Sequence, residues 1–204
     1  MSPTLQRLVE DIATCIKRID ARRPQAANAR TGEPYQPGIG PHPETQAVAL
    51  IAAELPLLDP AYQDRIQLGA PHQDGSHQKC DLCIGTPPGW DWAIEVKMLR
   101  LMGENGKAND NMLMHILSPY AIHRSALTNC EKLLGSRLAG CKAIVIYGFD
   151  YSELPMDPAI EAFVFLARAR VSLGPCAAAT YSGLVHPVHR EGRDFRWELS
   201  TALS

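Results

Sequence analysis

The chain has 204 residues, of which 46% are hydrophobic and 21% are charged. This length and apolar fraction suit one domain with a core of its own, so we expect a single domain over residues 1–204. The formal net charge of −2 argues against a protein that coats nucleic acid non-specifically, because such binding draws on many lysine and arginine contacts to phosphate. It does not argue against an enzyme whose basic groups are confined to one groove.

The expected compartment is the cytoplasm. No run of residues approaches the roughly 18–20 apolar positions that a membrane helix needs, so we expect no membrane partner. The first residues carry acidic side chains and lack the apolar core of a signal peptide. The six cysteines are scattered, mostly in apolar segments, which is typical of reduced and packed thiols in a cytosolic protein.

The first 60 residues predict two helices separated by a loop. Apolar residues recur at helical spacing from Leu5 to Ile19. The stretch from Arg22 to Gly40 is rich in Pro, Gly, Arg and Asn, and predicts a long loop. A second helix is expected from about His42 to Leu55, with Pro43 in its first turn and Pro56 ending it.

Three strands are expected next. They cover Arg65–Leu68, Lys79–Ile84 and Trp90–Leu99. The connection between the last two, Gly85–Gly89, is dense in turn residues and predicts a hairpin.

In the second half, Ala143–Tyr147 is a continuous apolar run, which predicts a central strand buried on both faces. Met102–Asn111 is polar and predicts a loop; this loop and the one before the second helix are expected to be the most mobile segments and to flank a substrate groove. The whole order is α-α-β-β-β-α-β-α-β-β, an α/β fold with a mixed sheet and helices on its faces. The remaining predicted elements are helices at about Pro119–Leu138 and Asp157–Arg170, and two late strands at about Ala177–Val185 and Asp194–Leu199.

The strand from Trp90 to Leu99 carries the most informative pattern. Alternation with period two buries its even positions and projects Glu95 and Lys97 together from the other face. If the hairpin connection is symmetric, Asp81 lies opposite Ala93 and is the diagonal neighbour of Glu95. Two carboxylates at that separation can share one hard cation such as Mg²⁺ or Mn²⁺, with an ammonium beside it. We therefore expect a metal site that lowers the pKa of a bound water and stabilises charge on a phosphate.

Asp81, a thirteen-residue spacer and then Glu95-Val96-Lys97 resembles the PD-(D/E)xK nuclease superfamily. The resemblance implies a restriction-endonuclease-like α-β-β-β-α-β core, here over about residues 42–148, with an added N-terminal helix and a C-terminal helix and hairpin. It implies an Mg²⁺-dependent endonuclease that acts on nucleic acid, more on DNA than on RNA, in restriction, phage defence or repair. Asp81 and Glu95 would bind the metal, and Lys97 would position the attacking water. One departure is that Cys80, and not a proline, precedes Asp81.

Further site residues are suggested by helices on either side of this motif. Glu44 begins the inward face of the second helix, where members of the superfamily place a glutamate that reaches the metal; the helix dipole also favours a carboxylate there, and both interpretations stay open. The later helix carries His123, Arg124 and Lys132, which would contact the substrate phosphate or else form a solvated face.

Two other groups of potential ligands are given a structural interpretation. His77, Cys80 and Cys83 have a spacing that suggests zinc, but on a strand the two cysteines point to opposite faces and no second pair follows, so buried thiols are favoured. His186 and His189 flank Pro187 and are interpreted as loop residues.

Two alternatives to a nuclease remain. One is a catalytically silent nucleic-acid-binding or scaffold protein on the same fold, which would have no reason to keep two acids and a lysine on one face. The other is a hydrolase of small phosphodiesters. A homodimer is a further expectation, because many such nucleases cut two strands, and the late hairpin is a candidate interface.

Overall fold

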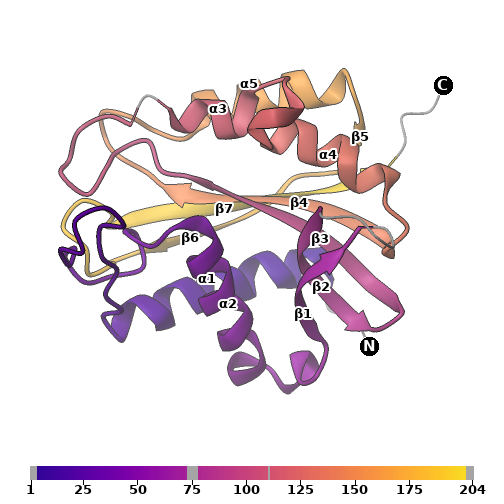
Figure 1. Ribbon diagram of the computed structural model, residues 1–204, viewed down its shortest axis with the longest axis horizontal. Helices are drawn as coiled ribbons and strands as arrows, with labels where there is room; N and C mark the ends of the chain where they lie inside the picture. The colour runs from indigo at the N-terminus through magenta and orange to yellow at the C-terminus, as the bar shows by residue number, and fades with distance from the viewer. Residues whose placement is uncertain (1–3, 73–77, 110, 201–204) are drawn as a thin grey trace.

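The computed structural model describes residues 4–72, 78–109 and 111–200. These residues form one mixed sheet of seven strands between two layers of helices (Figure 1). The expectation of an α/β fold with helices on both faces of a mixed sheet is confirmed. One face of the sheet is covered by α1 (Leu5–Ala21) and α2 (Glu44–Leu58). The other face is covered by α3 (Met112–Leu117), α4 (Ala126–Gly135) and α5 (Asp157–Arg168).

The strand order in the sheet is β1-β2-β3-β4-β7-β5, and β6 also pairs with β7. All neighbouring pairs are antiparallel except β3 and β4, which are parallel. Within the described ranges, no helix is long and apolar enough to cross a membrane. The strands are β1 (Ile66–Pro71), β2 (Lys79–Thr86), β3 (Gly89–Leu99), β4 (Ala139–Phe149), β5 (Ser172–Leu173), β6 (Ala177–Ser182) and β7 (Glu191–Ser200).

The two N-terminal helices follow the predicted pattern, with one difference at the end of α2. The apolar stripe of α1 is buried, and the Thr4 side chain accepts a hydrogen bond from the Arg7 amide at its start. Pro56 does not end α2; it lies in the last turn, and the helix continues to Leu58. Leu58 packs against the core, which favours one further turn. A short 3₁₀ helix, η1 (Pro60–Tyr62), then leads into β1.

The predicted hairpin between β2 and β3 is confirmed, but its predicted register is wrong. Leu82 pairs with Ile94 and Cys83 with Ala93, a shift of two residues from the expected pairing. The strands extend up to a tight turn at Pro87 and Pro88, and a bulge at Gly85 shifts the register once more. Because side chains alternate with period two, a two-residue shift leaves Asp81 on the same face as Glu95.

Gly85 is required at this bulge. Its φ of +132° is rarely adopted by residues with a side chain, and a Cβ there would lie 2.5 Å from the Asp91 amide nitrogen.

The predicted helix at Pro119–Leu138 is wrong in extent. The segment contains the 3₁₀ helix η2 (Ala121–His123) and then α4, and the preceding α3 was not expected. Arg124 has left-handed backbone angles, with φ +46° and ψ +44°, which interrupt any continuous helix. The Ser125 side chain then accepts a hydrogen bond from the Thr128 amide and caps α4.

The C-terminal half confirms the central strand and the late hairpin. Residues 143–149 of β4 are buried, as their unbroken apolar run predicts. The β6 and β7 strands pair as an antiparallel hairpin, and β7 also pairs with β4, so the hairpin is part of the central sheet. Its role as a dimer interface stays a prediction.

Candidate active site

The candidate site lies where β2 and β3 separate. Their pairing runs from the turn to Leu82 and Ile94, beyond which β2 continues beside β1 and β3 continues beside β4. Two backbone N–H groups of β3 then face no strand. The Val96 amide donates to Asp81 Oδ2 at 2.9 Å, and the Met98 amide donates to Glu44 Oε2 at 2.7 Å. Carboxylates therefore take the place of a strand at this point, which fixes their positions relative to β3.

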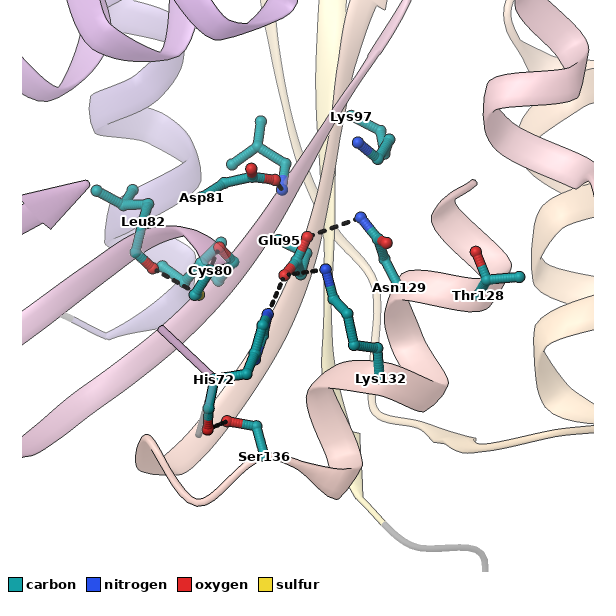
Figure 2. Close-up of polar contacts among 12 residues, drawn as sticks. His72, Cys80, Asp81, Leu82, Glu95, Lys97, Thr128, Asn129, Lys132 and Ser136 are labelled. Carbon is teal, nitrogen blue, oxygen red and sulfur yellow. Dashed lines mark hydrogen bonds and ion pairs between the residues drawn. The ribbon is translucent and has the colours of Figure 1, made fainter. Parts of the chain in front are cut away.

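Glu95 is the most extensively bonded residue of the site (Figure 2). Its side chain is 1% exposed and projects toward α4. Oε1 lies 2.9 Å from both His72 Nε2 and Lys132 Nζ, and Oε2 accepts a hydrogen bond from Asn129 Nδ2 at 2.7 Å. Two cationic or polar residues of α4 and one histidine after β1 thus hold this carboxylate in a single orientation.

Lys97 projects from the same face of β3 and is also buried. Its Nζ lies 2.9 Å from Glu44 Oε1, so one carboxylate of α2 binds both the Lys97 ammonium and the neighbouring Met98 amide. Glu44 therefore lies beside the motif, and its role as a metal ligand stays a prediction.

These side chains line one cavity of about 450 Å³. Its acids come from α2, β2 and β3, the two strands also contribute two lysines, and α4 and the turn before it contribute basic and polar groups. The residues that line the cavity are Glu44, Thr45, Gln78, Lys79, Asp81, Glu95, Lys97, Ala121, Arg124, Thr128, Asn129 and Lys132.

The electrostatics of the three motif residues differ. Burial, followed by the negative charge of Glu95, raises the pKa of Asp81 to about 7. Burial also disfavours the Glu95 carboxylate, but hydrogen bonding to His72 and the charge of Lys132 outweigh it and lower the pKa of Glu95. Burial likewise disfavours the Lys97 ammonium, but the charges of Glu44 and Asp81 outweigh it and raise the pKa of Lys97. Near neutral pH, Glu95 is ionised, Lys97 is protonated, and Asp81 is at its midpoint.

The predicted metal ligands do not form a preorganised three-carboxylate centre. Within the described ranges, no group of three or more His, Cys, Asp and Glu side chains is arranged to hold a metal ion. Glu44 is bound to Lys97 instead. Mg²⁺ takes one or two carboxylates and completes its shell with water and substrate oxygens, so a metal site on the remaining pair, Asp81 and Glu95, stays a prediction.

The structure brings most of the predicted substrate residues to the cavity. Arg124 and Lys132 line it, whereas His123 does not and instead lies 2.6 Å, through Nδ1, from Ser118 Oγ. The loops predicted at 22–40 and 102–111 contribute no lining residue among their described positions, and their expected mobility and place beside a substrate groove stay predictions. The first of these loops is closed on itself by a bridge between Ala27 and Pro34.

Two site residues were missed by the sequence reasoning. Asn129 is three residues before Lys132, which puts both on one face of a helix, so the spacing alone was sufficient to find it. His72 carries no such signal, because it follows β1 with no motif around it and reaches Glu95 only through the tertiary fold.

The other potential ligands have structural surroundings. Cys80 and Cys83 are free, buried thiols, as expected, and His77 lies outside the described residues. His186 and His189 belong to a loop, as expected, but are fully buried, with their rings stacked at 4.6 Å between centroids.

No family model, curated protein or solved structure matches the chain. The case for function therefore depends on the site itself.

Proposed function

We propose that this protein is a metal-dependent nuclease that hydrolyses phosphodiester bonds in nucleic acid, with DNA as the favoured substrate. One observation carries the proposal. At the separation of β2 and β3, Asp81, Glu95 and Lys97 line a single cavity whose opposite wall holds Arg124 and Lys132. Two acids and a lysine next to separate phosphate-binding cations are the groups that metal-assisted phosphodiester hydrolysis requires.

The proposal extends to the fold family. From α2 to β4 the chain passes through a helix, three antiparallel strands, the helices α3 and α4, and a strand parallel to β3, with short 3₁₀ helices before β1 and before α4. This order agrees with the restriction-endonuclease-like core of the PD-(D/E)xK superfamily. A cytoplasmic location and a homodimer are parts of the same proposal.

Each motif residue has a separate role in this proposal. Asp81 and Glu95 would hold Mg²⁺ or Mn²⁺, which when bound supplies an activated water and stabilises charge on the phosphate. Lys97, protonated and fixed by Glu44, orients the attacking water or stabilises the negative charge of the transition state. His72 and Asn129 keep the Glu95 carboxylate in place.

The basic residues that line the cavity support a phosphodiester as substrate. Lys79, Arg124 and Lys132 add positive charge to the cavity, and guanidinium and ammonium groups bind phosphate oxygens. These charges are local, which agrees with a chain whose net charge is −2.

The test uses purified protein with plasmid DNA, single-stranded DNA, RNA and a chromogenic phosphodiester, each in Mg²⁺, in Mn²⁺ and in EDTA. We expect cleavage of a nucleic acid with either metal, none in EDTA, and none by Asp81→Asn. Glu153→Gln, which removes an exposed acid outside the cavity, is the matched control and should cleave like the parent. Binding without cleavage would favour a silent binding protein, and activity on the chromogenic ester alone would favour a small-substrate hydrolase.

A further inference from the structure

An unusual share of the exposed apolar side chains falls in one segment, residues 113–122, which also contributes Ala121 to the cavity. Of the eight large hydrophobic side chains that are exposed in the described residues, four fall between positions 113 and 122. The two most exposed of these are Ile122, at 84%, and Tyr120, at 66%. The four are Leu113, Met114, Tyr120 and Ile122.

The turn that carries Tyr120 and Ile122 is held in one conformation. Ser118 Oγ accepts a hydrogen bond from the Tyr120 amide at 3.2 Å and lies 2.6 Å from His123 Nδ1. The Ser125 hydroxyl donates to the Ser118 carbonyl oxygen at 2.6 Å and so closes the turn at its base. The His123 ring meets the Tyr120 ring edge to face, with 5.9 Å between centroids. The backbone of the turn and the Tyr120 ring are thus held in place before any ligand binds, which lowers the entropy cost of binding a ligand there.

The position of this turn relates it to the cavity. Ala121 and Arg124 line the cavity, and Tyr120 and Ile122 are the immediate neighbours of Ala121 on either side. Because consecutive Cα atoms lie only about 3.8 Å apart, a nucleotide whose phosphate is bound by Arg124 and Lys132 is within reach of both apolar residues.

We propose that Tyr120 and Ile122 form a stacking platform for unpaired bases, so that the substrate is single-stranded or locally opened nucleic acid. This inference rests on the proposed nuclease function. Aromatic and apolar side chains beside a cationic, phosphate-binding groove are the combination that binds single strands, because each unpaired base has an exposed face. In a closed duplex the bases are stacked on one another and offer no face to Tyr120. The charge of the adjacent cavity favours this occupant over a second protein surface, which would have to bury Lys79 and Arg124.

The test measures binding by fluorescence anisotropy in metal-free buffer. The probes are a labelled single strand of about 20 nucleotides, the matching duplex, and the same duplex with a central mismatched bubble. We expect the parent to bind the single strand and the bubble more tightly than the duplex. Tyr120→Ala and Ile122→Ser should each weaken single-strand binding about tenfold, the size of losing one stacked base, and change duplex binding far less. Tyr120→Phe should bind like the parent. Phe165→Ala, at a side chain that is 77% exposed on α5 outside the cavity, is the matched control and should have no effect.

The outcomes separate this inference from the proposed function. If the parent cleaves nucleic acid but binds all three probes equally, or Tyr120→Ala binds the single strand like the parent, the platform is wrong and the nuclease stands. If the parent neither cleaves nor binds any probe, both are wrong. Loss of a dimer in the Tyr120→Ala and Ile122→Ser variants, with unchanged probe binding, would assign the surface to a second copy of the chain and overturn the platform.

Discussion

The ammonium of Lys97 lies 2.9 Å from the carboxylate of Glu44, although 53 residues separate them in the chain. Glu44 also accepts the Met98 amide, so α2 is joined to β3 by a charged and a backbone contact at once. The lysine is consequently held in a protonated form and at a fixed place before substrate arrives. Such preorganisation is what makes one positioned charge effective in a transition state.

Replacing Lys97 with Met tests whether that charge is catalytic. We expect cleavage per folded molecule to fall by about two orders of magnitude or more, the typical loss for one positioned electrostatic or acid–base group. Unfolding in urea should show a cost of only about 1–2 kcal/mol, because Glu44 keeps its bond to Met98 and is partly exposed. Lys17→Met, at an exposed position of α1, is the control for loss of a lysine charge. A folded Lys97→Met protein that cleaves like the parent would refute the mechanism.

Metal affinity should depend on pH through Asp81. Its pKa is raised to about 7, so below that pH the cation must displace a proton before it binds. Glu95, whose pKa is lowered, stays ionised and adds little to the dependence of metal affinity on pH. We expect Mn²⁺ affinity to rise about tenfold per pH unit between pH 5 and 7 and to level off above, as one released proton requires.

Calorimetric titration with Mn²⁺ at several pH values measures this dependence. In the Asp81→Asn protein the affinity should be much weaker and nearly independent of pH. A parent affinity that is already flat between pH 5 and 7 would contradict the role of Asp81 as a titrating ligand.

Lys132 is bonded to Glu95, the carboxylate that the proposed metal would use. Its Nζ lies 2.9 Å from Glu95 Oε1, the oxygen that also contacts His72. Lys132→Met removes a positive charge beside the site, and we expect Mn²⁺ to bind about tenfold more tightly as a result. Cleavage should nevertheless decrease, because in the proposed complex the same ammonium, which lines the cavity, would also contact the substrate phosphate. Weaker Mn²⁺ binding in Lys132→Met would instead mean that the lysine serves mainly to position Glu95.

A buried carboxyl far from the motif predicts a pH-dependent stability. Asp194 of β7 pairs with Tyr147 of β4 and is fully buried, and burial raises its pKa to about 8. The folded state therefore holds this proton more tightly than the unfolded state, whose carboxyl has the ordinary pKa near 3.8. The free energy of unfolding therefore falls as the pH rises from about 4 to about 8, because the unfolded carboxyl releases its proton over this range while the folded one keeps it.

Asp194→Asn keeps the shape of the side chain and removes this titration. We expect the variant and the parent to have similar free energies of unfolding near pH 4, and the variant to be the more stable at pH 8 and above. Urea unfolding at pH 4, 6 and 8 measures the difference. The difference in free energy of unfolding between the variant and the parent should grow with pH. A difference that is constant, or that shrinks as the pH rises, would show that Asp194 does not titrate as burial requires.

Patterns with a short range in the sequence were sufficient for most of the fold. The alternation along β3 and the unbroken apolar run of β4 each depend on neighbouring residues, and both predicted their strands. The break at Arg124 was missed because nothing in the residue type requires left-handed backbone angles there. The hairpin register was missed because the bulge at Gly85 is decided by how both strands pack and not by the turn composition alone.

The same contrast between local patterns and tertiary packing applies to the candidate site. Asp81, Glu95 and Lys97 share one hairpin, so their common face followed from period two even with the register wrong by two residues. The contact of Glu44 with Lys97, and that of His72 with Glu95, join segments distant in the chain and depend on how the helices and β1 are placed against β3. The spacing of residues along the chain does not predict such contacts.

The separation of β2 from β3 also bears on how such a protein would lose the proposed cleavage activity in evolution. Asp81 and Glu44 each accept an amide hydrogen from β3, and an uncharged carboxamide oxygen can accept the same hydrogen. A single change to Asn or Gln therefore removes the negative charge while it preserves the backbone bond. If selection for cleavage is relaxed, one substitution is therefore enough to give an inactive homologue with an intact sheet. Asparagine at position 81 or glutamine at position 44 would identify such a homologue.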